Sequence, residues 1–598
     1  MAVDTALRAA KTHCESVRAR IFRVTSDFPP AHWAMIHITP YLRTTRIAYF
    51  SMEIGIRPEI HTYSGGLGIL AGDAARTAAD LGLPMVFVTL ASRSGYLRQE
   101  IDPHGVQIDH PDPWNPEDYT QGLDVMVAVE IEGRTVWIRP WLYDLKSPLG
   151  RHVPIVLLDT NLKENDPRDR IITDRLYGGD KSERIRQEIV LGIGGERLLR
   201  ALGFTIETYH LNEGHAAFLA LSLLLRHRRE GRHAEQAHEV ERVREQCIFT
   251  THTPIEAGHD RFDYDDVRHI LGDVIALTDL KKLAGAECLN MTHLALNLSG
   301  YVNGVAQRHA QTAQSMFPGY RVRAITNGAH VPTWMHADIA AVVQDHLPHW
   351  AREPVSLFKV DEVSAEALWS AHQRAKAELI AEIKRTTGIE MRLDVPLLGF
   401  ARRMTGYKRP DLLFHDLDRL REINARYPLQ IVMAGKAHPH DREGKALIHA
   451  IHDDMREIRP LAAAFLPNYD MRLAAKLVAG ADVWLNTPLP PMEASGTSGM
   501  KAAFNGVLNF SVLDGWWIEG WDEGVTGWAI GKDEGPADAA AVAAELYSKL
   551  ETIILPLYFT DRPRWIWMMK QAIGKIGSVF NSQRMMRRYT TEAYVRHA

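Results

Sequence analysis

The chain has 598 residues, of which 46% are hydrophobic and 24% are charged, and its net charge is −5. A chain of this length and composition is expected to bury large cores and to divide into two or more domains. Its basic residues form no long run, which argues against a nucleic-acid footprint and a polybasic membrane contact. We therefore expect neither nucleic acid nor a membrane among its partners.

Cysteine usage and hydropathy indicate the compartment. Cys14, Cys247 and Cys288 are widely spaced, which supports neither a disulfide framework nor a zinc site. The segment from Met1 to Arg20 lacks the apolar core of a signal peptide, and no run of about 18 apolar residues occurs. We expect a cytoplasmic protein.

The first half of the chain alternates short apolar strands with helices and polar loops. Strands are expected at 47–51, 85–90, 208–212 and 247–250. A glycine-rich loop at 65–68 precedes an expected helix at 69–81. Glu213 and His215 follow one of the strands, but one acid and one histidine make an incomplete metal set, so we expect no metal.

The second half repeats strand, loop and helix more regularly. Strands are expected at 397–400, 431–434, 462–466, 483–485 and 507–512. Helices are expected at 410–426, 445–458 and 471–478. The unusual residues lie in the loops that follow strands, which predicts a doubly wound parallel sheet with its site at the carboxyl ends of the strands.

These two series predict an α/β protein in which two similar doubly wound domains face a central cleft. The turn signal at 325–329 separates them, which places one domain at 1–325 and the other at 326–564. The first 40 residues are expected to be helical. The segment 565–598 is also expected to be helical and to cross back to the first domain.

The most informative motif is the run from Glu493 to Lys501, EASGTSGMK. Its small residues expose backbone N–H groups and hydroxyls at the start of a helix, which suits a phosphate. Lys501 is expected on the first helical turn. An amine there acts either as a point charge on phosphate or, with a lowered pKa, as a Schiff-base nucleophile.

A second motif places four cations in one loop after a strand, namely Arg402, Arg403, Lys408 and Arg409. Such a density of positive charge favours a bound phosphate or carboxylate over a solvated basic loop.

Other signals leave alternatives open. The loop around Gly66 fits an ordinary strand-to-helix turn as well as it fits a functional turn. It lies too far from the preceding strand for a dinucleotide fingerprint. His252 can bond a sugar hydroxyl, but a buried and satisfied histidine is favoured. Asn327 is interpreted as a turn residue. Trp516-Trp517 and Trp521 are interpreted as core rather than as sugar-stacking platforms.

Together these residues resemble the α-glucan phosphorylases, the family of glycogen, starch and maltodextrin phosphorylases. The motifs that carry the resemblance are 493–501, Arg403 with 407–409, 64–68, 326–328 and 435–439. The resemblance implies a two-domain GT-B fold and pyridoxal 5′-phosphate bound to Lys501 as a Schiff base. It also implies reversible phosphorolysis of α-1,4-glucans from the non-reducing end to α-D-glucose 1-phosphate with retained configuration, in which the cofactor phosphate donates the proton.

The resemblance further implies a role for individual residues. Catalytic roles are implied for Lys501, Arg403, Lys408 and His252. Cofactor contacts are implied for Lys501, Arg402, Gly66, Thr497, Ser498, Trp334 and Tyr469. Substrate contacts are implied for Glu493, Ser495, Gly496, Asn327, His252 and Tyr407. The implied partners are an α-1,4-glucan or maltooligosaccharide, inorganic phosphate, glucose 1-phosphate and a second copy in a homodimer.

The chain departs from the family pattern in places. Asp470 stands where vertebrate enzymes carry arginine, Arg402 replaces a lysine, and the run from Thr497 to Met500 replaces Thr-Gly-Asn-Met. The chain is much shorter than the regulated animal enzymes, so we expect neither their phosphorylation switch nor their nucleotide site.

Two alternative functions remain. One is a nucleotide-sugar glucosyltransferase such as glycogen or starch synthase, which shares the fold but carries a second glutamate eight positions after the first. Eight positions after Glu493 this chain has Lys501. The other is a catalytically silent glucan-binding scaffold, against which the intact Lys501, Arg403 and Lys408 argue.

Overall fold

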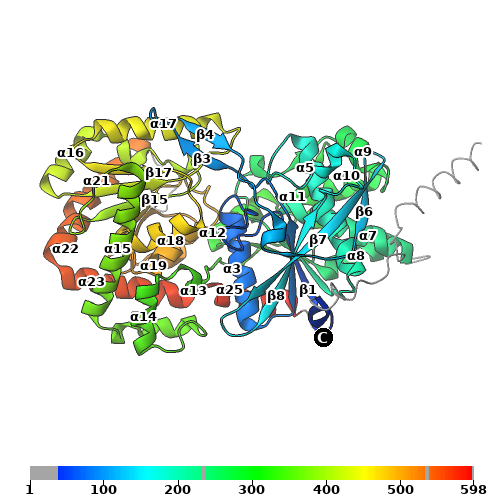
Figure 1. Ribbon diagram of the computed structural model, residues 1–598, viewed down its shortest axis with the longest axis horizontal. Coiled ribbons are helices and arrows are strands. Elements are labelled where there is room, and N and C mark those ends of the chain that lie inside the picture. The colour runs from blue at the N-terminus through cyan, green and yellow to red at the C-terminus, as the bar shows by residue number, and fades with distance from the viewer. Residues whose placement is uncertain (1–37, 231–235, 532–537, 596–598) are drawn as a thin grey trace, which may run out of the picture.

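A computed structural model describes residues 38–230, 236–531 and 538–595, and the helix expected within the first 40 residues lies almost wholly outside this range. Two sheets form two bodies, one from each half of the chain (Figure 1). Among these residues, no helix combines the length and the apolar character needed to cross a membrane.

The first sheet has ten strands, and its central part is parallel. The order along it is β14-β13-β10-β9-β1-β2-β8-β7-β5, with β6 paired to β7. Its strands are β1 (Ile47–Ser51), β2 (Met85–Leu90), β5 (Gln121–Gly122), β6 (Val127–Ile131), β7 (Arg134–Lys146), β8 (His152–Asp159), β9 (Thr208–Asn212), β10 (Cys247–Thr250), β13 (Tyr301–Gly304) and β14 (Arg323–Ala324). The four strands expected in this half are confirmed. The antiparallel edge from β5 to β8 was not predicted.

Helices cover both faces of this sheet (Figure 1), which accounts for the burial of most side chains on its parallel strands, including the polar His210, Asn212 and Asn303. They are α3 (Gly66–Leu81), α4 (Pro167–Arg170), α5 (Lys181–Ile189), α6 (Gly195–Ala201), α7 (Ala217–Glu230), α8 (Gln236–Gln246), α9 (Tyr264–Leu271), α10 (Leu277–Ala284), α11 (Met291–Asn297) and α12 (Gln307–Met316). Two small antiparallel pairs, β3 (Arg98–Ile101) with β4 (Gln107–His110) and β11 (Arg261–Phe262) with β12 (Leu289–Asn290), lie outside the main sheet. Helix α3 begins three residues before the expected start, because the glycine-rich loop forms its first turn.

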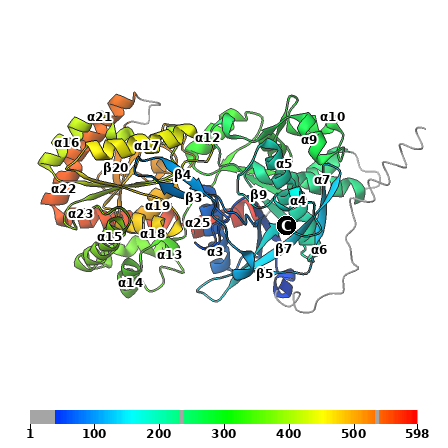
Figure 2. The same cartoon turned by 45° about the horizontal axis from the view of Figure 1, so that its top comes forward.

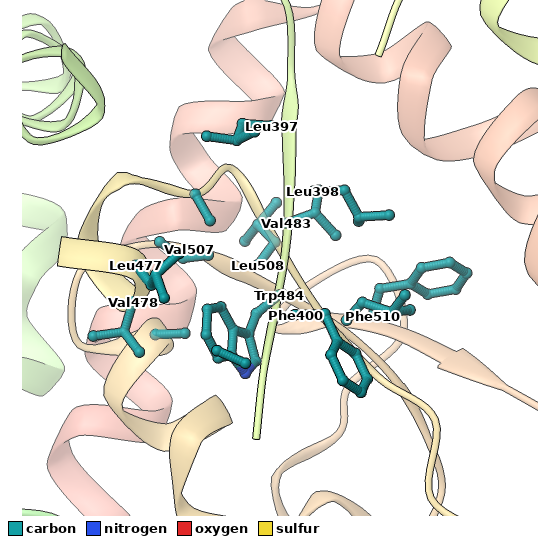
Figure 3. Close-up of a cluster of buried hydrophobic side chains, with 14 of the residues drawn as sticks. Leu397, Leu398, Phe400, Leu477, Val478, Val483, Trp484, Val507, Leu508 and Phe510 are labelled. Carbon is teal, nitrogen blue, oxygen red and sulfur yellow. The ribbon is translucent and has the colours of Figure 1, made fainter. Parts of the chain in front are cut away.

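The second sheet has six parallel strands in the order β17-β16-β15-β18-β19-β20. They are β15 (Leu397–Ala401), β16 (Gln430–Ala434), β17 (Ala462–Leu466), β18 (Val483–Asn486), β19 (Leu508–Val512) and β20 (Gly527–Ile530). Figure 3 shows buried side chains of β15, β18 and β19, among them Phe400, Trp484 and Phe510, packed with Leu477 and Val478 of α18. The five parallel strands expected in this half are confirmed, whereas β20 was not predicted.

The remaining α-helices follow β14 in the chain, and most of them surround the second sheet. They are α13 (Val331–Trp334), α14 (Ala337–His346), α15 (Ala365–Thr387), α16 (Leu417–Arg426), α17 (Arg442–Glu457), α18 (Met471–Gly480), α19 (Thr497–Ala503), α20 (Trp517–Gly520), α21 (Ala539–Lys549), α22 (Leu555–Thr560), α23 (Arg562–Gln571), α24 (Gly577–Val579) and α25 (Ser582–Tyr589). The single helix expected at 410–426 is wrong. A short 3-10 turn at Leu412–Phe414 precedes α16, whose start is capped by the Asp416 side chain.

The C-terminal segment returns to the first body. Helix α25, red in Figures 1 and 2, lies beside α3. The Tyr594 hydroxyl lies 2.8 Å from His210 Nδ1, and the Tyr589 hydroxyl lies 3.1 Å from Thr250 Oγ1. The end of the chain therefore contacts the strands that carry the predicted site residues of the first half.

Candidate active site

A cavity of about 1210 Å³ lies between the two halves of the chain. Every residue that the sequence predicts for the site lines it, although the roles of these residues stay predictions. They are Gly66, His252, Asn327, Trp334, Arg402, Arg403, Tyr407, Lys408, Tyr469, Glu493, Ser495, Gly496, Thr497, Ser498 and Lys501. The loops and helix starts after β1, β10 and β14 of the first sheet and after β15, β17 and β18 of the second bring them together. This is the expected place for a site in parallel sheets, which bind ligands at the carboxyl ends of their strands.

Lys501 is the fifth residue of α19, so it lies on the second helical turn rather than on the first. Its side chain is buried, and this burial lowers the pKa of the amine to about 8. The helix starts after Gly496, whose φ of 86° favours glycine. A Cβ on Gly499 would lie 2.3 Å from Asn509 Oδ1, so the small residues let α19 pack tightly beneath the cavity.

Trp334 provides an aromatic face for this amine. Lys501 Nζ lies 4.0 Å from the centroid of the Trp334 ring. The indole N–H donates to Asp73 Oδ2 at 2.9 Å, and the same oxygen accepts the backbone N–H of His330 at 3.2 Å. Asp73 belongs to α3, so a carboxylate from the first half of the chain orients an aromatic ring of the second.

Glu493 is paired with two of the cations. It accepts hydrogen bonds from Arg402 Nη2 at 2.6 Å and from Lys408 Nζ at 2.5 Å. Burial alone would raise the pKa of Glu493, but the charges of Arg402 and Lys408 lower it to about 2. Its backbone N–H donates to Asp514, and burial raises the pKa of this second carboxyl to about 6.

The loop of four cations divides into two groups. Arg402, Arg403 and Lys408 line the cavity, and Arg402 Nε and Nη1 are buried without a hydrogen-bond partner in the part of the chain that the structure describes. Arg409 instead donates to the backbone carbonyls of Thr487 and Pro488 at 2.8 and 2.9 Å. The density of charge that favoured a bound anion therefore includes one structural arginine.

The glycine-rich loop lies opposite these cations. Arg403 Nη2 lies 3.6 Å from the position that a Cβ on Gly65 would take, whereas a Cβ on Gly66 would meet no atom within 4 Å. The N-terminus of α3 carries no side-chain cap. Its unpaired N–H groups and the Arg403 guanidinium together form a site suited to an anion.

His252 from the first half and Asn327 from the start of the second also line the cavity. His252 Nε2 lies 2.6 Å from Asn212 Oδ1, and the His252 backbone N–H donates to Glu213 at 2.7 Å. Burial lowers the pKa of His252 to about 4, so its ring is neutral at physiological pH. Asn327 is buried, and its Oδ1 has no hydrogen-bond partner within residues 38–230, 236–531 and 538–595, which the interpretation as a simple turn residue does not explain.

The three tryptophans near β19 differ in exposure. Trp516 and Trp517 are buried, as the core interpretation expects, and the Trp516 ring centroid lies 5.0 Å from that of Phe580. Trp521 is 40% exposed, so the core interpretation is wrong for it.

Sequence reasoning gave no site role to Glu53 or to Lys436, although Lys436 lies in the matching motif 435–439. Glu53 is buried and accepts the backbone N–H groups of Ser64 and Gly65 at 2.6 and 3.2 Å, which fixes the glycine-rich loop. Lys436 lines the cavity, and its burial lowers the pKa of its amine to about 8. Their positions could have indicated the site, because residues just after parallel strands lie at its edge. Glu53 comes two residues after β1, and Lys436 comes two residues after β16.

Comparison with known proteins gives a consistent result. A family model described as carbohydrate phosphorylase matches residues 255–525. Maltodextrin phosphorylase of Thermococcus litoralis is 40% identical over 92% of this chain and 70% of its own length. Glycogen phosphorylases of Aquifex aeolicus and Mycobacterium tuberculosis are each 36% identical over 92% of this chain, and over 86% and 71% of their own lengths. The chain belongs to the carbohydrate phosphorylase family.

Proposed function

We propose that this chain is an α-glucan phosphorylase that cleaves α-1,4-glucans from the non-reducing end with inorganic phosphate and releases α-D-glucose 1-phosphate with retained configuration. The relatives named maltodextrin and glycogen phosphorylase support this proposal. The observation that carries it is the meeting of Lys501, three cations and the glycine-rich loop around one cavity.

The residues of the cavity fit pyridoxal 5′-phosphate as the cofactor. Lys501 has a buried amine of lowered pKa, which suits covalent attachment. Arg402 Nε and Nη1 are buried without a partner among the described residues, and these are donors that phosphate oxygens need. Thr497, Ser498 and Tyr469 lie along the same wall. When bound, the cofactor supplies a phosphate group that exchanges protons near pH 7.

The protein's own groups would bind the reacting molecules and balance their charge. Arg403, Lys408 and the N–H of Gly66 would hold inorganic phosphate, because cations and a helix N-terminus compensate neighbouring anions. Glu493 is ionised at neutral pH and can only accept hydrogen bonds, so it suits glucose hydroxyls. Glycosidic cleavage usually needs two carboxyl groups, and a phosphate near Glu493 would replace the second.

Further contacts to glucose would come from Ser495, Gly496 and Asn327 in the cavity wall. Asn327 Oδ1 has no partner among the described residues, so it would accept a hydrogen bond from a glucose hydroxyl. The ring of His252 is held by Asn212, which leaves the main-chain carbonyl of His252 to face the sugar.

We propose the same division of the chain that the sequence predicts. Residues 1–325 and 326–564 would be the two Rossmann-like domains of a GT-B fold, and 565–598 the segment that crosses back. The two parallel sheets with the cavity between their halves support this division. A homodimer and a location in the cytoplasm are the matching proposals for assembly and compartment.

The deciding assay measures glucose 1-phosphate released from a maltooligosaccharide and inorganic phosphate, and phosphate released in the reverse direction. Activity in both directions is expected. Activity only with ADP-glucose or UDP-glucose would support the synthase alternative, and binding of the glucan without either reaction would support the scaffold.

A further inference from the structure

One antiparallel hairpin leaves the first body and lies against the second. Strands β3 and β4 belong to the first half of the chain, yet both views show them beside α17 of the second half (Figures 1 and 2). At the rim, Lys445 Nζ donates to Asp109 Oδ2 at 2.5 Å, and Arg456 donates to the carbonyl of Pro103 at 2.7 Å. The hairpin therefore bridges the two halves beside the cavity.

Two buried glutamine side chains make the central contacts of this bridge. Gln99 Nε2 donates to Gln107 Oε1 and to the carbonyl of Gly435, both at 2.8 Å. Gln107 donates to the carbonyl of Ala437 at 2.9 Å and accepts the N–H of Ala437 at 3.0 Å. The backbone on both sides of Lys436 is thus held by side chains from the other half of the chain.

The same hairpin holds a second loop of the cavity. The N–H of Asn468 donates to Gln99 Oε1 at 2.8 Å, and the N–H of Gln99 donates to Asn468 Oδ1 at 3.1 Å. Asn468 has a φ of 56° and immediately precedes Tyr469, which lines the cavity. The amine of Lys436 donates to the carbonyl of Leu97 at 2.8 Å, one residue before β3.

We propose that the β3–β4 hairpin is a clasp that positions Lys436 and Tyr469 in the cavity, with Gln99 and Gln107 as its positioning residues. An amide side chain offers both donors and an acceptor, so the pair can satisfy the carbonyls and N–H groups of two loops at once. Neither glutamine is among the described residues that line the cavity. The clasp deepens the proposed function, because it fixes two walls of the site where we place the cofactor.

The energetic reason for this clasp is the cost of unpaired buried groups. Without Gln107, the carbonyl and the N–H of Ala437 would lose their partner in a buried setting, which typically costs about 1–3 kcal/mol for each group. The loop that carries Lys436 would then move toward water to recover these bonds. Its amine would be hydrated, and the burial that lowers its pKa would be lost.

The test compares Gln107→Leu and Gln107→Glu with Ile108→Ala, a control on the same strand whose side chain is 39% exposed. Competitive acetylation of the cofactor-free protein across a pH series, read by mass spectrometry, gives the titration midpoint of Lys436. We expect this midpoint near pH 8 in the parent and in Ile108→Ala, and higher by about one unit or more in Gln107→Leu. Gln107→Glu keeps the acceptors and loses the donors, so an intermediate rise is expected, and it carries the test if Gln107→Leu does not fold.

A second readout is the dissociation constant for pyridoxal 5′-phosphate, which should rise about tenfold or more in Gln107→Leu and stay unchanged in Ile108→Ala. A Lys436 midpoint and a dissociation constant that match the parent in both folded variants would overturn the clasp. The acetylation experiment does not depend on phosphorolysis. If the parent protein lacked phosphorolytic activity, the proposed function would be refuted, and the titration midpoint of Lys436 would still test the clasp.

Discussion

Lys501 Nζ lies 4.0 Å above the ring of Trp334, and this contact joins the chemistry of the cavity to its architecture. The ring face favours the charged amine, whereas burial disfavours it. Burial prevails, since the pKa of Lys501 falls to about 8. The amine is therefore neutral in a sizeable fraction of molecules near pH 8, as covalent attachment of a carbonyl cofactor requires.

Replacing Lys501 by Met should stabilise the cofactor-free protein at neutral pH. The amine has a pKa of about 8 in the folded chain and 10.5 when unfolded. At pH 7 this difference lowers the free energy of unfolding by about 3 kcal/mol, because folding buries the charged amine. Between pH 8 and 10.5 the unfolded state binds the extra proton, so the stability of the parent rises with pH and the advantage of Lys501→Met shrinks. Melting temperatures at pH 7 and 9.5 check this, and a constant difference would contradict it.

Asp73→Asn should lower the pKa of Lys501 below its present value. The Asp73 carboxylate raises this pKa by its charge, and Arg76 lowers it, so removing the acid leaves two effects that both favour the neutral amine. We expect a shift of about one unit, measured by acetylation of the cofactor-free protein. Asp80→Asn is the matched control on the same helix, since Asp80 bonds His330 and Ser147. An equal shift in both variants would refute the assignment to Asp73.

Lys408→Ala should impair the use of phosphate and largely spare cofactor content. The lost charge-assisted bond predicts an increase of about 10- to 100-fold in the KM for inorganic phosphate. Arg409→Ala is the control in the same loop, because Arg409 bonds the carbonyls of Thr487 and Pro488. It should lower the melting temperature and leave the phosphate KM nearly unchanged. Loss of folding in Lys408→Ala would assign that lysine a structural role instead.

Gly66→Ala and Gly72→Ala should separate function from stability on one helix. A methyl group on Gly66 would meet no atom of the described residues within 4 Å, so the fold should persist. Gly66 lines the cavity, so the same methyl group should raise the KM for phosphate several-fold. A methyl group on Gly72 would lie 2.0 Å from the Gly55 carbonyl oxygen. This clash predicts that Gly72→Ala lowers the free energy of unfolding by about 1–3 kcal/mol. Melting curves and phosphate kinetics of the two variants distinguish these effects.

The sequence predicted the second sheet well because its strands are short apolar runs at regular spacing. It also placed most of the site residues in loops after strands or at the helix starts that follow them, and all of these residues line one cavity. These signals are local, and the topology of parallel strands brings them together.

Local sequence patterns could not predict contacts between segments that are far apart in the chain. The pairing of Glu493 with Arg402 and Lys408, the hydrogen bond from Trp334 to Asp73, and the role of Glu53 join segments far apart in the chain. The break before α16 depends on one capping side chain, which the apolar periodicity of 410–426 conceals.

The most direct test of this account is borohydride reduction of the purified protein followed by peptide mapping. Reduction makes a covalent attachment of the cofactor to an amine permanent, so its position can be read by mass spectrometry. The account predicts a pyridoxyl group on Lys501, and its loss in Lys501→Met. A protein that carries no pyridoxyl group, or carries it only on another lysine such as Lys436, would contradict the central claim.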